Sequence, residues 1–280
     1  MLFLDYFGQP WYILLLGALF AGPPTLQPAT EKLSLDDLVA KHVESVGTAE
    51  DRAAAKSRVA LGTVAFLERI SGTVHLDGRA AMLSSGPMFK ASFDFTNPQY
   101  KGEQFVFDGE KVQIAMIDQQ SRSALGNFLV NETEIVHEGL FGGVLRTGWP
   151  LQDLKSSAGK WKFDGEKKIE RRELYELTYL PKQRSSAGEL LIHVYFEPTT
   201  YRHVMTVYRL EKTVDEGGEA QASIAGTQTT TVEERFDDFR PVDGLTLPFS
   251  WDIRLRVEPS SKAQEFEWKV SLASIAHNKL

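Results

Sequence analysis

Apolar and polar side chains alternate almost without error in two segments near the C-terminus. Across 251–257 the odd positions are apolar and the even ones charged, and across 265–272 the even positions are apolar. A period of two places neighbouring side chains on opposite faces of a β-strand, so each segment predicts a strand with one apolar face. One-sided burial of this kind is typical of antiparallel sheets, because parallel sheets are usually covered on both faces.

Similar strand patterns fill much of the remaining chain. They run through 59–117, with 72–76 and 79–84 as separate strands, return between 161 and 210, and resume from 232. Asp-Gly pairs favour two-residue hairpin turns, and they occur at Asp77–Gly78, Asp108–Gly109, Asp164–Gly165 and Asp243–Gly244. Because a sheet this large usually curls, we predict a mainly β (α+β) fold. Its core would be one strongly curved antiparallel sheet of about eleven strands, a half-barrel.

Two helices are expected before the first strand. In Ser34–Val46, Ser34 can cap the N-terminus, acidic residues occupy the first turn, and Gly47 follows the last apolar position. These are the usual signals for the start and end of a helix. A short second helix is expected at Ala49–Lys56.

The centre of the chain departs from the strand pattern. The apolar residues of Asn131–Arg146 have helical spacing, although Gly139, Gly142 and Gly143 would each weaken a free helix by roughly 1 kcal/mol. Close packing against another surface would offset that cost. We therefore expect this helix to lie over the concave face as a lid, with Trp149 near one rim. A crevice should remain between this helix and the sheet. Leucine in place of Gly142 and Gly143 should then block the crevice while the protein stays folded.

The alternation also assigns side chains to faces. Charged neighbours of the apolar positions should face solvent, and they are Lys90, Asp94, Arg254, Glu267 and Lys269. The apolar positions, together with those of the central helix, should line a hydrophobic ligand cavity: Phe89, Phe93, Phe95, Ile114, Met116, Leu140, Phe141, Val144, Leu145, Trp149, Ile253, Leu255, Phe266 and Trp268.

The N-terminus has the character of an export signal. Trp11–Ala21 is a run of eleven apolar residues, followed by a proline-rich stretch up to Pro28. A helix that spans a bilayer needs about 20 residues, so this run is too short to cross a membrane. Its length suits the core of a signal peptide. Residues 1–10 lack the usual Lys or Arg. We expect a signal peptide and linker at 1–28 and a single domain at 29–280, with an uncleaved membrane anchor as the alternative.

Composition excludes several classes of function. The formal net charge is −7 and no extended basic run occurs, which argues against binding to nucleic acid. The chain has no cysteine, so disulfides, thiolate catalysis and a lipid-modified N-terminal cysteine are excluded.

Catalytic motifs are missing from the sequence. No G-x-S-x-G occurs, and the glycine-rich stretch 138–143 does not continue into a phosphate-binding loop. His137–Glu138 begins like a zinc-protease motif, but Phe141 stands where the second histidine is required.

Two further sets of polar residues are candidate sites. A hairpin could bring His193 and His203 side by side, but two imidazoles alone make a poor zinc site. The adjacent acids Glu233–Glu234 and Asp237–Asp238 should point apart on a strand. The sequence therefore predicts no catalytic residue, no metal and no cofactor.

Several phrases resemble the LolA/LolB-like superfamily of periplasmic lipoprotein carriers, over roughly residues 33–275. They are LVAKHVESVG at 38–47, FDG at 107–109, EGLFGGVLRTGWPL at 138–151 and FDDFRPVDGLTLPF at 236–249. The resemblance implies an incomplete barrel that holds a lipid or the acyl chain of a lipoprotein between sheet and helices. It also implies a monomer in the periplasm, with donor and acceptor proteins in the envelope. The arginine that helps to hold this family's cavity closed cannot be matched to a residue here.

Three functions remain open after these observations. The first is a carrier or binding protein for a lipid, an acylated lipoprotein or another hydrophobic ligand. The second is an envelope scaffold whose core is filled by its own side chains, and the third is a hydrolase with an unrecognised site.

Overall fold

The computed structural model describes residues 33–279 apart from 71, 117–121, 216–224 and 259–263. Residues 33–280 form one compact unit. The apolar run at 11–21 and the linker up to Pro28 lie outside the described residues. Within the described part of the chain, no helix combines the length and the apolar character needed to cross a membrane.

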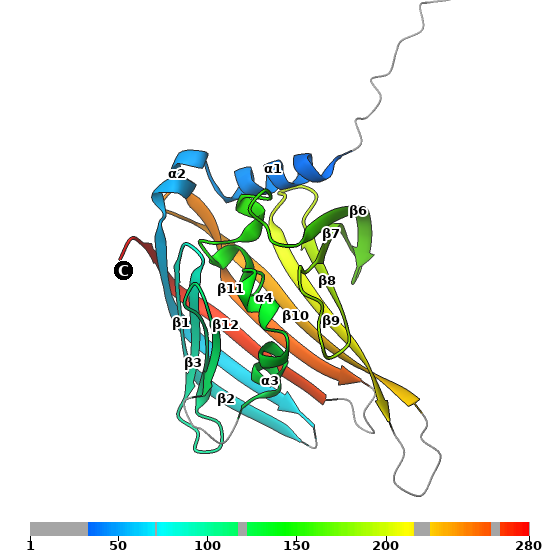
Figure 1. Cartoon of the computed structure of the whole chain (residues 1–280). Coiled ribbons are helices and arrows are strands. Elements are labelled where there is room, and N and C mark those ends of the chain that lie inside the picture. Colours follow the sequence, from blue (N-terminus) through cyan, green and yellow to red (C-terminus); the bar gives the residue numbers. More distant parts are fainter. Residues whose placement is uncertain (1–32, 71, 117–121, 216–224, 259–263, 280) are drawn as a thin grey trace, which may run out of the picture. The chain divides into compact units, whose positions relative to one another are not determined.

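Twelve antiparallel strands form a single sheet (Figure 1). Their order is β5-β4-β3-β2-β1-β12-β11-β10-β9-β8-β7-β6, so two meanders, β1–β5 and β6–β12, meet where β1 pairs with β12. The strands are β1 Ser57–Arg69, β2 Thr73–Ser85, β3 Met88–Phe95, β4 Gly102–Phe107, β5 Val112–Met116, β6 Lys160–Ile169, β7 Arg172–Leu180, β8 Glu189–Phe196, β9 His203–Asp215, β10 Ala225–Val242, β11 Leu245–Glu258 and β12 Gln264–His277. The sheet stays open, and the predicted fold class is confirmed.

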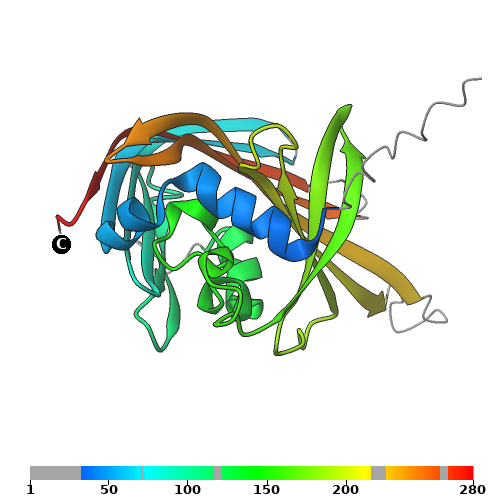
Figure 2. The same ribbon diagram turned by 90° about the horizontal axis from the view of Figure 1, so that it is seen from above.

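Short helices lie inside the curve of the sheet and across one of its ends. Figure 2 shows the sheet bending around the segment that carries α3 and α4, and Figure 1 shows α1 and α2 across one end of the sheet. The helices are α1 Leu35–Val46, α2 Ala49–Ala54, α3 Ala124–Asn131 and α4 Thr133–His137, with 3-10 turns η1 Gly143–Leu145 and η2 Pro150–Gln152. We call residues 123–152 the covering segment.

The first helix begins and ends where its sequence predicts. The Ser34 hydroxyl accepts a hydrogen bond from the backbone nitrogen of Asp37, and the Asp37 carboxylate accepts one from the Ser34 nitrogen, both at 3.1 Å. This reciprocal pair satisfies two backbone donors at the start of the helix. Gly47 follows the last residue of α1, and α2 falls within the predicted range.

Two of the four Asp-Gly pairs lie in hairpin connections. Asp243 and Gly244 have φ of 48° and 79° and connect β10 to β11 in a two-residue loop. Positive φ at both central positions is what a type I′ turn requires. Asp108–Gly109 also lies in a hairpin connection, between β4 and β5, but the loop extends over residues 108–111 and only Gly109 has a positive φ.

The other two Asp-Gly pairs lie inside strands, so those turn predictions are wrong. Gly78 pairs with both Val64 and Phe95 in the middle of β2, which joins the two strands predicted around it. A Cβ at Gly78 would stand 2.4 Å from the carbonyl oxygen of Asp94, so close strand approach explains this glycine. Gly165 has φ of 87° at a shift of register within β6, where it makes a bulge.

The predicted central helix is also largely wrong. Helix α4 ends at His137, because Gly139, Gly142 and Gly143 all have left-handed φ, at 82°, 87° and 48°. A left-handed residue cannot continue a right-handed helix. Helix α3, which the pattern did not predict, provides the longest helical part of the covering segment.

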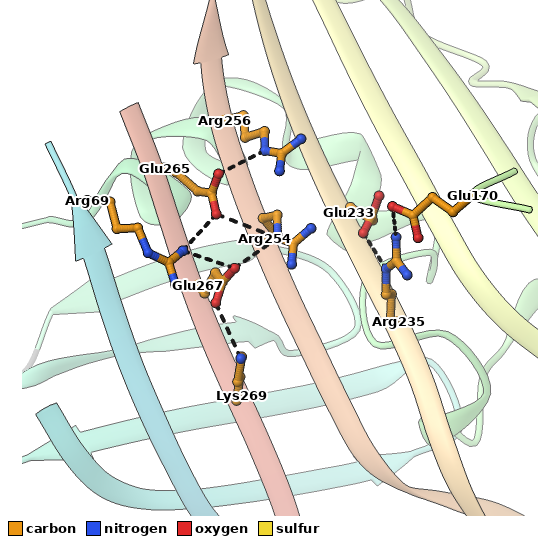
Figure 3. A network of polar contacts seen from close by, with 9 residues as sticks. All are labelled: Arg69, Glu170, Glu233, Arg235, Arg254, Arg256, Glu265, Glu267 and Lys269. Atoms are coloured by element: carbon orange, nitrogen blue, oxygen red, sulfur yellow. Dashed lines mark hydrogen bonds and ion pairs between the residues drawn. The ribbon is translucent and has the colours of Figure 1, made fainter. Parts of the chain in front are cut away.

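The predicted faces of the sheet are correct with one exception. Lys90, Asp94 and Arg254 are partly exposed and Lys269 is exposed, but Glu267 is only 4% exposed. Its carboxylate lies 3.0 Å from Arg254, 3.3 Å from Arg69 and 3.5 Å from Lys269 (Figure 3). The long cationic side chains of β1, β11 and β12 cover this acid on the polar face of the sheet.

Candidate functional site

The covering segment packs its apolar residues against the concave face. Its predicted lining residues are all at most 2% exposed: Leu140, Phe141, Val144, Leu145 and Trp149. The ring of Phe141 lies 5.3 Å from that of Trp251 and 5.5 Å from that of Phe105, in edge-to-face geometry. Such ring contacts add to the burial of apolar area, so the segment is a tightly packed second layer.

The predicted lining residues of the sheet are buried beneath this layer. Those at most 8% exposed are Phe89, Phe93, Phe95, Ile253, Leu255, Phe266 and Trp268. Ile114 is half-buried, and the side chain of Met116 lies outside what the structure describes. Aromatic contacts such as Phe93 with Trp251, at 5.9 Å, fill much of the space predicted to be a crevice.

A cavity of about 220 Å³ remains between α3 and the sheet. Its apolar floor comes from Phe128 of α3, Leu210 of β9 and Leu255 of β11. The remaining lining residues are Ala124, Asn127, Asn131, Lys212, Gln228, Thr230 and Val257. Leu255 is therefore a predicted lining residue that borders this cavity. Trp149 borders a separate hollow of about 460 Å³, next to the β2–β3 turn.

A buried glutamate joins the sheet to the covering segment. Glu234 of β10 is 0% exposed and accepts hydrogen bonds from Tyr208 (2.7 Å), from the Trp251 indole (2.8 Å) and from the backbone nitrogen of Gly142 (2.8 Å). Burial raises the pKa of Glu234 to about 7, although these three donors and the more distant Arg146 favour its ionised form. The Glu234 carboxyl therefore changes between its protonated and its ionised form at a pH close to 7.

A second buried glutamate holds the start of α3. Glu103 of β4 is 0% exposed, and its carboxylate accepts hydrogen bonds from the Ser123 nitrogen (2.8 Å), from the Ser123 hydroxyl and from Tyr100 (3.2 Å). Ser123 also caps α3, since its hydroxyl accepts a bond from Gly126. Burial raises the pKa of Glu103. The link from strand to helix therefore depends on a single carboxyl group.

Two more glutamates tie the segment to the other half of the sheet. Glu138, after α4, accepts hydrogen bonds from the Tyr179 hydroxyl (2.6 Å) and from the Lys182 nitrogen (3.2 Å). Glu132, after α3, accepts one from the Ser185 hydroxyl at 2.7 Å. Burial raises the pKa of both carboxyls. The covering segment is thus held at four points by carboxylates that accept hydrogen bonds.

Two buried arginines bind backbone carbonyls of the covering segment. Arg58 of β1 donates to the carbonyls of Val144 and Leu145, both at 2.9 Å. Arg146 donates to Val136 and to Pro87 at 2.8 Å. Burial lowers the pKa of each guanidinium to about 10, so both remain charged at neutral pH. They satisfy carbonyls that this irregular backbone leaves without helical partners.

A histidine cluster lies where α1 meets the covering segment. The Trp149 indole donates to His42 at 3.1 Å, and its ring stacks on His203 with centroids 4.9 Å apart. Both histidines are buried, and burial lowers the pKa of His42 to about 4 and that of His203 well below its usual range. Both rings are therefore neutral near pH 7.

The candidate polar pairs do not assemble into sites. His193 lies on the outer face beside Glu176, at 3.0 Å, whereas His203 is buried on the inner face beside Trp149. Glu233 faces outward beside Arg235 while Glu234 faces inward, so that pair diverges as predicted. Among the described residues, no group of three or more potential ligands could hold a metal ion.

The chain is similar to several solved structures at low sequence identity. It matches no protein-family model and no curated protein sequence. A LolA superfamily protein from Nitrosomonas europaea matches at 13% identity with a TM-score of 0.44, over 89% of this chain and 95% of that one.

Two further solved structures are similar to this chain. A putative outer membrane lipoprotein-sorting protein domain from Vibrio parahaemolyticus matches at 12% identity and a TM-score of 0.42, covering 86% of this chain and 94% of that one. The lipoprotein LppX of Mycobacterium tuberculosis matches at 13% identity and a TM-score of 0.23, over 63% and 90%. Likenesses this distant carry no argument about the ligand.

Proposed function

We propose that this protein is a carrier that holds a lipid, or the acyl chain of a lipoprotein, between its curved sheet and the covering segment. The observation that carries the proposal is the cavity under α3. Its floor of Phe128, Leu210 and Leu255 is apolar and adjoins the buried aromatic layer of the concave face. The sequence phrases that resemble LolA-like carriers favour the same function.

The size of the cavity indicates that α3 must move when a chain binds. Sites for small molecules usually enclose about 300–1,000 Å³, whereas this cavity encloses about 220 Å³. Each methylene removed from water contributes about 0.8 kcal/mol, so a chain of about 15 carbons gains on the order of 12 kcal/mol. That gain exceeds what breaking the few hydrogen bonds that hold α3 would cost, at about 1 kcal/mol net each.

The proposed ligand path runs from this cavity along the aromatic layer of the concave face. On this proposal the fourteen residues predicted from the sequence line the space that opens when the covering segment shifts. Residues 1–28 would direct export to the periplasm, where a monomer would exchange its ligand with donor and acceptor proteins of the envelope. The function requires no catalytic residue and no cofactor.

The rival function is an envelope scaffold with a permanently filled core. The aromatic contacts of Phe141 with Phe105 and Trp251 favour it, because they fill the space between the covering segment and the sheet at that point. The two functions differ in whether the covering segment ever leaves the sheet. Lipid extraction and mass spectrometry of protein purified from its native envelope separate them directly.

A cavity-filling variant provides the matched test in vitro. Leu255→Trp adds bulk beneath α3 and should weaken binding of a fluorescent fatty acid at least tenfold. Leu61→Trp is the control, because Leu61 is 50% exposed, away from the cavity. Thermal unfolding should show that both variants are folded. Absence of lipid from the native protein, together with no fatty-acid binding by the parent, would refute the carrier function.

A further inference from the structure

The concave face changes from apolar to polar at one end of the cavity. Along β9, Tyr208, Leu210 and Lys212 share the inward parity, so a lysine follows two buried apolar positions. Lys212 pairs in register with Gln228 of β10, and Thr230 is the next inward residue on that strand. The apolar floor therefore ends in a strip that carries an ammonium, an amide and a hydroxyl.

Lys212 gives this end of the cavity a positive charge. Of the described residues that line the cavity, Lys212 alone carries a formal charge, and its polar neighbours are Asn127, Asn131, Gln228 and Thr230. Side-chain amides and hydroxyls donate hydrogen bonds to anionic oxygens. A cation beside several neutral donors and an apolar floor complements a molecule with an anionic head and a hydrocarbon tail.

We propose that the ligand is an amphiphile with an anionic head, a carboxylate or a phosphate, and that Lys212 binds this head while the chain lies under α3. This proposal rests on the carrier function and specifies its class of ligand. The side-chain amides of Asn127 and Asn131, on the face of α3 that lines the cavity, complete the head site together with Gln228.

A purely structural role for Lys212 would be to balance the charge of Glu132. The lysine does lower the pKa of that carboxyl, but burial outweighs this effect and leaves the pKa raised. The Glu132 carboxylate already accepts a hydrogen bond from Ser185 at 2.7 Å. No ion pair within 4 Å joins the two side chains in the described structure, so the ammonium is available to a ligand.

Four probes that share a sixteen-carbon chain test the proposal on the delipidated full-length protein at pH 8. They are hexadecanoate, hexadecyl phosphate, hexadecanol and hexadecyltrimethylammonium, each at submicellar concentration. A charge-assisted hydrogen bond should favour at least one anionic probe over hexadecanol by about tenfold. The cationic probe should bind more weakly than the alcohol. Comparison of the two anions shows whether a carboxylate or a phosphate fits better.

Replacement of the lysine separates recognition of the head from support of the fold. Lys212→Met keeps the aliphatic length, so it should abolish the preference for anions and leave hexadecanol affinity within twofold. Lys160→Met, at an exposed position on the edge strand β6, should leave all four affinities unchanged.

The possible failures are distinguishable. Equal binding of anions and alcohol by the parent protein overturns the proposed head site but leaves the carrier function standing. A uniform loss of affinity for all probes in Lys212→Met, with a lower melting temperature, assigns the lysine a structural role and also overturns it. Failure of the parent to bind any probe removes the carrier function, and the head site with it.

Discussion

The carboxylate of Glu234 accepts a 2.8 Å hydrogen bond from the backbone nitrogen of Gly142, which joins β10 directly to the covering segment. The same oxygen accepts from the Trp251 indole, and the second oxygen interacts with the Tyr208 hydroxyl. A protonated acid, or an amide, can keep all three contacts if its second atom donates to the tyrosine oxygen. Glutamine is therefore a close mimic of the neutral form.

Glu234→Gln should become more stable than the parent as pH rises. The folded pKa of about 7 lies above the ordinary value of 4.5 for a glutamate, so the favourable contribution of the neutral acid is present below about pH 4.5 and lost by about pH 7. The difference in unfolding free energy should therefore grow by about 3 kcal/mol over that interval. Urea unfolding of both proteins at several pH values measures it. A constant difference would show that Glu234 does not titrate in this range.

Glu103→Ala should loosen α3 selectively. It removes the acceptor for both donors of Ser123, and leaving a buried donor unpaired costs about 1–3 kcal/mol. Hydrogen–deuterium exchange should accelerate across Ala124–Asn131, and fatty-acid exchange should accelerate with it. The control is Glu110→Ala in the exposed β4–β5 turn. Unchanged exchange in α3 would contradict this anchoring role.

Gly143→Ala should destabilise the protein by at least about 2 kcal/mol. Gly143 has φ of 48°, and left-handed backbone costs other residues about 1–2 kcal/mol. An added Cβ would also stand 2.6 Å from the His203 ring. Leucine in place of Gly142 and Gly143 would therefore disturb the fold as well as block the crevice.

The matched control for that substitution is Gly72→Ala. Gly72 has an ordinary φ, and a Cβ there would meet no atom within 4 Å. Chemical unfolding should give this control the stability of the parent protein. An equal loss of stability in both alanine variants would show that the left-handed conformation of Gly143 is not the cause.

Acid should weaken the contact between α1 and the covering segment. The His42 pKa of about 4 means that the folded protein excludes a proton that the unfolded chain binds near pH 6.5. The stability contribution of neutral His42 is thus present above about pH 6.5 and is lost as pH falls to about 4. Proton NMR should show the His42 ring neutral at pH 5 and the Trp149 indole proton still hydrogen-bonded. A protonated ring at that pH would contradict the burial argument.

The faces of the sheet followed from sequence because alternation is a local signal. In Trp251–Val257 and in Phe266–Leu272, the alternation alone shows which side chains are buried, and no information about a neighbouring strand is needed. The cap at Ser34 and the turn at Asp243–Gly244 are local in the same way. Whether a residue lies within a strand or in a turn depends, by contrast, on the neighbouring strands. The Asp77–Gly78 pair therefore has the sequence of a turn, although Gly78 lies within β2 and pairs with β1 and β3.

The polar ties between sheet and covering segment could not be predicted. Glu103 and Glu234 sit in strands where acids normally face solvent, and only the three-dimensional approach of Ser123, Gly142 and Trp251 explains their burial. One signal was present: Glu234 shares the inward parity of Val232 and Phe236. An acid on the apolar parity of a strand marks a place where another element must supply donors.

The pairing of β1 with β12 has a consequence for how the protein reaches its folded state. It joins Arg58 to His277, which are 219 positions apart in the chain, at the centre of the sheet. Each meander can form from hairpins between neighbours, but this seam must wait for the last strand to emerge. Until then β1 presents an unpaired edge, a template for aggregation. Long-range pairing of this kind slows folding, so the closing of this seam should limit the rate at which the whole sheet forms.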